Sequence, residues 1–416
     1  MCRGRGRTNP MLRPYAQAMS APSPPLPAGR LWAALLASTL VNLPLGSVYS
    51  FSVFLRPIEQ ELAVPRSALS LVFALATIGF TVGSVGAAFL YRLASAPVLV
   101  LASALIAAAG IAIAGTAPGL PQLMLGYGIV FGTGGGVAYI LCQQGVNMLV
   151  RTRRGLVNGY LVSLYPLGAM IATPLFHASN EAFGWRLTLA GLAGVLVVAG
   201  ALAALLVRVS GARLAPPASA TADSPPVLGS LFVKISATFF FAASAGLMVL
   251  SQAREIVGTY GGAATLAVAA TTGITGAIAA ARIGGGWLVD RFAVPHVMCA
   301  AHALALCGGL LLTLLPGPLT AVLGLGMIGM GYGFISGATA GGIAIYWSPV
   351  DFGRVAGRTY IAWCLAAICL PTLAGWLFDR TGNYATAVAI AGAANVTGMV
   401  IAFTLPRRGG RDDRPS

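Results

Sequence analysis

Arg282 is the basic residue that lies deepest within an apolar segment of this sequence, eight residues before Asp290. In a helix that rises about 1.5 Å per residue, this places it about 12 Å from that acidic residue. An arginine at this depth in a bilayer costs at least about 2.5 kcal/mol unless it faces a cavity or a partner. No Asp or Glu falls inside an apolar segment, so we expect an anion that binds from solution. The alternative is that Arg282 reaches the aqueous edge or caps helix carbonyls.

Hydroxyl, amide and aromatic side chains recur at helical spacing in this segment and in others. Residues separated by three, four or seven positions share one face of a helix. Such a face either lines a solute path or makes contacts between helices, and spacing alone leaves both open. The faces are Thr271, Thr275, Ile278 and Arg282; Asn42, Gly46 and Tyr49; Tyr139, Gln143 and Asn147; Tyr332 and Ser336; and Tyr360, Trp363 and Ala367.

The elements that must position these residues are long apolar helices. The chain of 416 residues is 57% hydrophobic and 8% charged, with a mean hydropathy of +0.84. A soluble domain has about a quarter charged residues. Apolar segments of about 20 residues span a bilayer, where a helix satisfies its own backbone groups. We predict an all-α membrane protein with twelve transmembrane helices, at 31–55, 67–91, 96–115, 119–148, 155–178, 185–207, 229–252, 262–289, 294–314, 318–346, 354–378 and 383–405.

A Pro-rich polar break at 209–227 divides the twelve segments into two sets of six. Arg92 and Arg291 are 199 residues apart, and Pro174 and Pro371 are 197 apart, so the halves repeat at a nearly constant offset. Parallel six-helix repeats place a solute site at their interface. The predicted divisions are a disordered cytoplasmic tail at 1–29, a six-helix bundle at 30–207, a cytoplasmic linker at 208–228, a second bundle at 229–405 and a cytoplasmic tail at 406–416.

The basic residues predict the orientation of the protein in the membrane. With the N-terminus inside, 18 of the 25 Arg and Lys residues fall in cytoplasmic segments, 5 in outer segments and 2 within helices. We therefore expect both termini to be cytoplasmic in a multi-pass protein of a bacterial inner membrane. The net charge of +15 is then a topology signal, and its scatter over short connections argues against nucleic-acid binding. The first 29 residues lack the apolar core of a signal peptide.

The loop after the eighth segment reads GWLVDR, from Gly286 to Asp290 and Arg291. Glycine allows close helix approach, and the Asp/Arg pair is suited to holding one face closed in one conformation. After the second segment, Tyr91-Arg92 stands where Asp-Arg is expected. We predict a conformational latch built from Gly286, Asp290, Arg291 and Arg92. An ordinary helix end with mixed charge is the alternative for either loop alone.

The GxxxDR pattern of this loop resembles that of the major facilitator superfamily. Four further stretches resemble its oxalate/formate antiporter branch, which is related to the monocarboxylate transporters. These stretches are RRGLVNG (153–159), GWLFDRTGNY (375–384), GSVYSF (46–51) and GGGVAY (134–139). The resemblance covers 31–405 and implies two pseudo-symmetric six-helix bundles that alternate access around a central site for small carboxylates.

The resemblance also implies an essential arginine on the eighth helix, which matches Arg282. It implies tyrosines from the first, fourth and tenth helices and a tryptophan from the eleventh, and Gln143 shares a face with the fourth-helix tyrosine. The expected substrate-binding residues are Arg282, Tyr49, Tyr139, Gln143, Tyr332 and Trp363. Each tyrosine, the glutamine and the tryptophan is equally suited to packing between helices.

One departure from the branch bears on the substrate. The oxalate-exchanging member has a lysine on the eleventh helix, where this chain has Ala367, seven residues after Tyr360. A dicarboxylate needs two cations, so we expect a monoanion or a larger organic acid with a polar or aromatic body. The predicted function is a secondary transporter of a small organic anion. The alternative is a transporter or exporter of a neutral or amphipathic compound such as a drug, vitamin or aromatic metabolite, because Tyr165-Pro166-Leu167-Gly168 resembles a stretch of drug antiporters.

Other chemistry is not indicated by the sequence. Intramembrane catalysis needs clustered nucleophiles, acids or metal ligands, and the three histidines are scattered. The six cysteines have no metal-binding spacing. We expect no enzymatic activity, metal or cofactor, and a monomer whose partners are the solute and the lipid bilayer. Coupling to protons or to a counter-anion stays open, since no carboxylate is embedded in an apolar segment.

Overall fold

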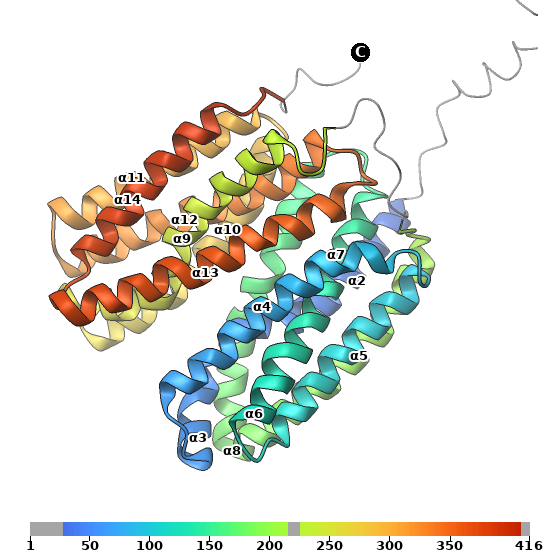
Figure 1. Ribbon diagram of the computed structural model, residues 1–416, viewed down its shortest axis with the longest axis horizontal. Helices are drawn as coiled ribbons and strands as arrows, with labels where there is room; N and C mark the ends of the chain where they lie inside the picture. The colour runs from blue at the N-terminus through green and yellow to red at the C-terminus, as the bar shows by residue number, and fades with distance from the viewer. Residues whose placement is uncertain (1–27, 215–224, 409–416) are drawn as a thin grey trace, which may run out of the picture.

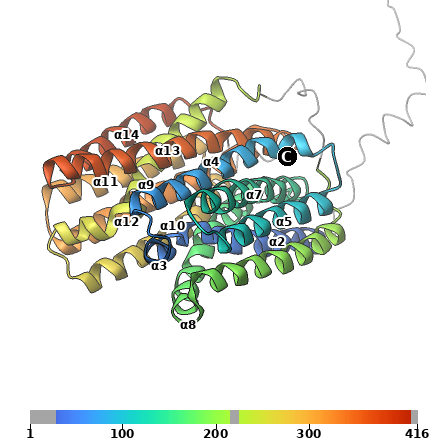
Figure 2. The same ribbon diagram turned by 60° about the horizontal axis from the view of Figure 1, so that its bottom comes forward.

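The computed structural model describes residues 28–214 and 225–408, and every regular element in these two ranges is a helix. Eleven helices are long and apolar enough to cross a membrane. One of them, α8 (Arg154–Ser210), has 57 residues and would extend about 85 Å, far beyond the roughly 30 Å of hydrocarbon. The chain turns inside α8 at Gly184, whose φ of +78° is a conformation that glycine adopts readily. Figure 2 shows the two arms of α8 in green. Ten helices and two arms confirm the twelve predicted spans.

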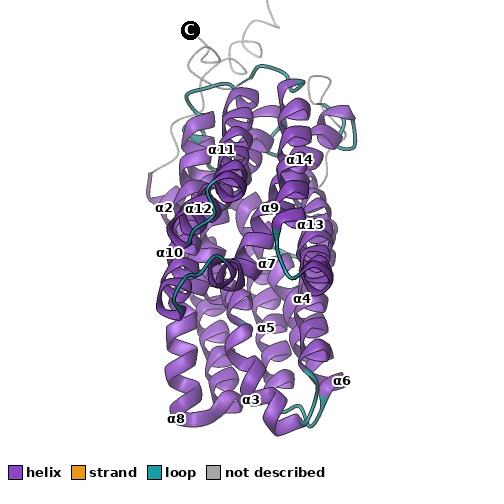
Figure 3. Cartoon of the chain, turned by 90° about the vertical axis from the view of Figure 1, so that its left-hand side faces the viewer, coloured by secondary structure: helices purple, strands orange, loops and turns teal. Residues whose placement is uncertain are grey.

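The predicted segments agree with the helices to within a few residues, except that the first ends in a break and the seventh continues to Thr259, seven residues past its predicted end at 252. At the break, α2 gives way to a short 3₁₀ turn, η2, and then to α3, which lies beyond the span. Figure 3 shows the helices and the short loops that join them. The first half contains α2 (Ala28–Gly46), η2 (Ser47–Ser50), α3 (Ser52–Leu62), α4 (Arg66–Leu90), α5 (Ala96–Gly115), α6 (Leu120–Leu123), η3 (Met124–Phe131), α7 (Gly132–Asn147) and α8. The second half contains α9 (Ser230–Thr259), α10 (Ala264–Val289), α11 (Val294–Leu314), α12 (Pro318–Tyr346), α13 (Phe352–Thr381) and α14 (Ala385–Phe403).

Large apolar side chains cover the outside of the helices. Leu71, Val82, Leu175, Leu205 and Leu323 are each more than half exposed, at positions inside predicted spans. A water-soluble protein rarely shows apolar surface on this scale, whereas lipid accepts it. The exposed surface therefore fits a multi-pass membrane protein.

The helices form two bodies that meet at one end and diverge toward the other (Figure 1). We call the end that carries Ala28 and Arg408 the terminal end, and the opposite one the far end. The first half packs α2 and α5 on α8 and α4 on α7, while the second packs α12 on α10 and α11 and α14 on α11. Across the interface, α8 contacts α10 and α4 contacts α13. The two halves therefore face each other through these helices, and α12 of the second half also contacts α8.

Glycines bring the two halves into backbone contact near the terminal end. A Cβ atom on Gly155 of α8 would collide with the carbonyl of Gly286 of α10, and one on Gly286 would collide with Gly155. Gly357 of α13 lies in the same way against the backbone of Ser84 of α4. Since a side chain at these positions has no room, the sequence permits a tight closure here that other residues would prevent.

Candidate functional site

A cavity lies between the two halves and is lined from both. Residues of α2, η2, α4, η3, α7 and α8 face residues of α9, α10, α12 and α13 around about 570 Å³ of empty space. More than half of the lining side chains are aromatic. The lining consists of Leu45, Val48, Tyr49, Phe73, Ala76, Thr77, Phe80, Phe131, Gly132, Gly135, Tyr139, Tyr165, Phe239, Arg282, Tyr332, Ser336, Tyr360 and Trp363.

Arg282 is the charged residue in this lining, and it is 5% exposed. Its Nη1 donates to the carbonyl oxygen of Val162 at 2.7 Å, and its Nη2 donates to the Tyr332 hydroxyl at 3.0 Å. The guanidinium carbon lies 5.2 Å from the centre of the Tyr332 ring. Val162 belongs to the first half and Tyr332 to the second, so the guanidinium bridges the interface. Its Nε atom is buried and has no hydrogen-bond partner.

The charge of Arg282 has no acidic partner in the part of the chain that the structure describes. The ion pairs there join His177 to Glu181, Arg186 to Glu61 and Arg354 to Asp351. Removing a cation from water without a counter-charge is costly, and this cost falls when an anion binds beside it. The cavity therefore has the electrostatics of an anion-binding site.

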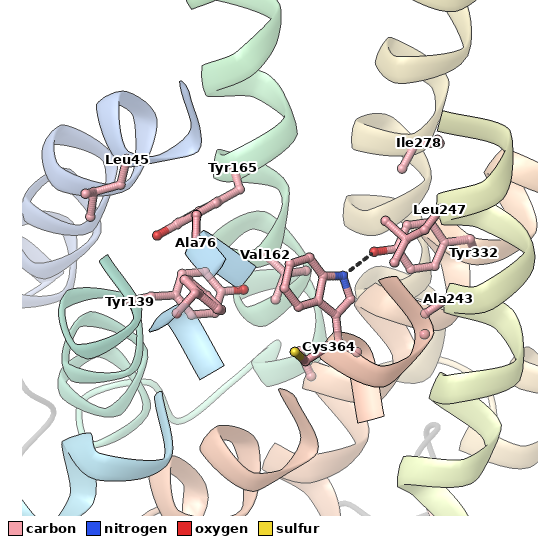
Figure 4. Close-up of a cluster of buried hydrophobic side chains, with 14 of the residues drawn as sticks. Leu45, Ala76, Tyr139, Val162, Tyr165, Ala243, Leu247, Ile278, Tyr332 and Cys364 are labelled. Carbon is pink, nitrogen blue, oxygen red and sulfur yellow. Dashed lines mark hydrogen bonds between the residues drawn. The ribbon is translucent and has the colours of Figure 1, made fainter. Parts of the chain in front are cut away.

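The Tyr332 hydroxyl is held by two donors. It accepts from Arg282 Nη2 at 3.0 Å and from Trp363 Nε1 at 3.1 Å; Figure 4 marks the second bond with a dashed line. A phenol has one hydrogen to donate, and neither of these partners can accept it. That hydrogen is left for another acceptor, such as a carboxylate beside Arg282. Gly246 of α9 makes room for the Tyr332 ring, since a Cβ there would overlap it.

Five of the six substrate-binding residues predicted from the sequence line this cavity together: Arg282, Tyr49, Tyr139, Tyr332 and Trp363. Gln143 does not. It is 1% exposed and lines a neighbouring cavity, one helical turn beyond Tyr139 on α7. Thr271 and Thr275, which share a helix face with Arg282, are absent from the lining and donate to carbonyls of their own helix.

Several lining residues are not among the six predicted substrate-binding residues. Phe80, Tyr165 and Phe239 come from α4, α8 and α9. Phe80 contacts the rings of Tyr139, Tyr165, Tyr360 and Trp363 at centroid distances of 5.4 to 5.8 Å. Figure 4 shows Tyr139 and Tyr165 on one side of the interface and Tyr332 on the other. The proline that follows Tyr165 could have drawn attention to this position, whereas a phenylalanine within an apolar segment gives no indication that it lines a cavity.

The predicted latch is built differently from an Asp/Arg pair. The Asp290 carboxylate accepts the backbone N–H groups of Gly155 and Leu156, each at 2.8 Å, at the N-terminus of α8. Burial raises the pKa of Asp290, and these two hydrogen bonds oppose the rise. Arg291 lies exposed over the ring of Trp287 at 3.8 Å. Arg92 is also exposed. Asp290 therefore makes its contact with the other half at a helix N-terminus.

A second contact of the same kind uses an amide. Gly353 stands 198 residues after Gly155, in the first turn of α13, and its N–H donates to Gln144 Oε1 at 2.7 Å. Gln144 Nε2 donates in turn to the carbonyl of Pro349 at 3.0 Å. Tyr91, which replaces the aspartate in the first half, is buried and places its hydroxyl against Gly353. Sequence reasoning missed Gln144.

Metal-binding chemistry is not evident in the described ranges 28–214 and 225–408. No three His, Cys, Asp or Glu side chains gather there in an arrangement that could hold a metal ion.

One family model and several known transporters are similar to this sequence. The family model of the Major Facilitator Superfamily matches residues 35–341. The sequence is 26% identical to mouse "Monocarboxylate transporter 11", over 93% of this chain and 90% of that protein. It is 27% identical to bovine "Monocarboxylate transporter 13", over 90% and 89%. It is 25% identical to the Escherichia coli "Uncharacterized MFS-type transporter YhjX", over 70% and 73%.

Solved structures share the fold. The transporter FucP in an outward conformation superposes with a TM-score of 0.68 at 17% identity, over 89% of this chain and 97% of FucP. The proton:xylose symporter XylE gives 0.69 at 15%, over 91% and 96%. The human organic anion transporter MFSD10 gives 0.65 at 13%, over 90% and 100%. At these identities the likeness concerns the fold alone.

Proposed function

This chain belongs to the Major Facilitator Superfamily, and we propose that it carries a small organic anion across a bilayer with Arg282 as the group that binds the anion. One observation supports this most: the Arg282 guanidinium is buried between the two halves, has an unpartnered Nε, and has no acidic partner among the described residues. A carboxylate supplies the missing charge and accepts from a charged donor, a strong type of hydrogen bond.

The chemistry around Arg282 favours a monocarboxylate. Tyr332 has a hydroxyl hydrogen left to donate, and the aromatic lining suits an apolar body. The lining contains one cation, where a dicarboxylate would need two. The names of the mouse and bovine relatives point to the same substrate class.

The arrangement of the halves supports transport by alternating access. The Asp290 and Gln144 contacts hold the terminal end together. Release of a solute at that end requires these contacts to break while others form at the far end. We propose that the terminal end and both termini lie in the cytoplasm of a bacterial cell, which the excess of basic residues supports. The present conformation then faces outward, in a protein that acts as a monomer with the division into two bundles and a linker given above.

Replacement of Arg282 by Ala tests the proposal. Purified protein in liposomes is assayed by counterflow of radiolabelled pyruvate, lactate, benzoate and oxalate. Loss of a buried, hydrogen-bonded charge costs about 2–5 kcal/mol, so we expect transport to fall at least about thirtyfold. Arg380→Ala is the matched control, because Arg380 is exposed and stacks on Trp376 at 3.9 Å. Unchanged carboxylate flux in Arg282→Ala would contradict the proposal.

A neutral or amphipathic aromatic cargo is the second candidate, and the aromatic lining favours it. Benzoate and benzamide separate the two candidates because they share size and ring. Uptake of both at similar rates would favour the neutral cargo. Uptake of benzoate alone would favour the anion. Repeating the assay with a pH gradient, or with an internal carboxylate, distinguishes proton symport from anion exchange.

A further inference from the structure

A second, smaller cavity adjoins the central one. It shares Phe239, Ser336 and Tyr360 with the central cavity. α7 and α12 run toward the terminal end, and each extends from the central cavity into the second one. Gln143 lies one turn beyond Tyr139, and Thr339 lies one turn beyond Ser336. The second cavity is therefore stacked on the terminal side of the first.

Two hydrogen-bonding groups in this lining lack partners. Gln143 is 1% exposed, and its Nε2 has no hydrogen-bond partner. Thr339 is 3% exposed, and its Oγ1 also has none. Burying such donors without an acceptor is unfavourable, so buried polar groups in proteins are nearly always paired. A hydrogen-bond acceptor inside the cavity would therefore satisfy both side chains.

The boundary between the cavities is marked by Arg282 and by a pair of tyrosines. Arg282 Nη1 donates to the carbonyl of Val162, a residue that lines the second cavity. The hydroxyls of Tyr139 and Tyr360 lie 2.5 Å apart and join α7 of the first half to α13 of the second. Tyr360 lines both cavities. A solute that leaves Arg282 toward the terminal end must therefore pass this tyrosine pair and enters the second cavity next.

We propose that the second cavity is a separate, uncharged carboxylate-binding site, where the Gln143 amide and the Thr339 hydroxyl hold the substrate between Arg282 and its exit at the terminal end. The site rests on the proposed function, since its ligand is the same anion. Neutral donors satisfy carboxylate oxygens but bind them less strongly than a guanidinium does. Successive sites of weaker affinity let a solute leave a pathway without being trapped.

The test compares the two faces of the membrane. Right-side-out vesicles present the far end to the medium in the proposed orientation, and inverted vesicles present the terminal end. KM for radiolabelled pyruvate and benzoate is measured in both for the unaltered protein, Gln143→Leu and Thr339→Val. Loss of hydrogen bonds to a charged group predicts a KM about tenfold higher in inverted vesicles. In right-side-out vesicles we expect a change below about twofold, because the central site is untouched.

Thr238→Val is the matched control. Thr238 is fully buried on α9, and its hydroxyl also lacks a partner, but it lines neither cavity. Its KM should be unchanged on both faces. Thr339→Val keeps the side-chain shape, so it tests the site even where Gln143→Leu does not fold.

Three outcomes would overturn the second site. An unchanged KM on both faces in Thr339→Val and Gln143→Leu means that neither side chain holds the anion. An equal rise on both faces assigns them to the central site. If the unaltered protein takes up neither anion saturably from either face, the proposed function itself fails, and that failure is visible before any variant is made.

Discussion

The Tyr332 hydroxyl lies 3.0 Å from Nη2 of Arg282 and 3.1 Å from Nε1 of Trp363, so one oxygen positions the two side chains. Arg282 comes from α10, Tyr332 from α12 and Trp363 from α13, all in the second half. The Nε donor of the guanidinium group has no hydrogen-bond partner, and the hydrogen of the phenol is left for another acceptor. This pairing makes the affinity for an anion depend on Tyr332 as well as on Arg282.

Tyr332→Phe removes the shared acceptor and keeps the ring. Two buried donors then lose their partner, which costs about 1–3 kcal/mol. We expect the apparent affinity for a transported carboxylate to fall about tenfold in counterflow. Tyr384→Phe, which loses only a bond to Gln252, is the control and should transport normally. An unaltered affinity in Tyr332→Phe would show that this hydroxyl does not position the arginine.

Gly246→Ala should impair transport although Gly246 does not line the cavity. Its Cβ would overlap the Tyr332 ring, and overpacking of this kind costs about 1–3 kcal/mol. The displaced ring would carry its hydroxyl away from Arg282, so we expect a higher KM together with a lower melting temperature. Gly258→Ala on the same helix has open space around the new Cβ and should leave both unchanged. Equal behaviour of the two variants would contradict this account.

Asp290 should make closure of the terminal end depend on pH. Burial raises the pKa of its carboxyl in the closed state above that of the same group exposed by opening. A raised pKa stabilises the closed state fully below the ordinary pKa, and this stabilisation is lost as pH rises through the raised value. Acidification through that window should therefore favour closure. The distance between spin labels at the exposed Leu93 and Phe292, on opposite halves, measures it.

Asp290→Asn should abolish that pH dependence because the amide does not titrate. We expect the open population of Asp290→Asn to be the same at acidic and at neutral pH. A pH response of the same size in Asp290→Asn would assign the titration to another group.

Gln144→Leu should loosen the second contact at the terminal end. The N–H of Gly353 and the carbonyl of Pro349 both lose their partner, at a cost of about 1–3 kcal/mol each when buried. The same spin labels should report a larger open fraction, independent of pH. Gln122→Leu, which removes bonds within the first half at the far end, should not change this distance.

Much of the fold was predictable because hydropathy depends on composition over a whole helix. The twelve spans follow from the length of the apolar segments, and Arg282 stands out because a charge at membrane depth is costly. The single helix from Arg154 to Ser210 corresponds to the two predicted segments, because Gly184 turns the chain inside it.

The sequence predicts which face of a helix a residue lies on, but it predicts less well how far along the helix axis that residue lies relative to the cavity. Tyr139 and Gln143 share a face of α7, but they lie about 6 Å apart along its axis. The crossing of the two halves decides which of them meets the central cavity, and sequence spacing does not contain that crossing. Gln144 contacts Gly353, and Gly246 contacts Tyr332. Each pair joins segments that are far apart in the chain, so a single sequence does not indicate either contact.

Equilibrium binding of benzoate and benzamide to the purified protein tests the central claim most directly, because it does not depend on coupling or direction of transport. Isothermal titration calorimetry is carried out on the unaltered protein, Arg282→Ala and the control Arg380→Ala. The account predicts that benzoate binds to the unaltered protein and the control at least about thirtyfold more tightly than to Arg282→Ala, and that benzamide does not distinguish the three. Equal affinity of benzoate for all three proteins would contradict it.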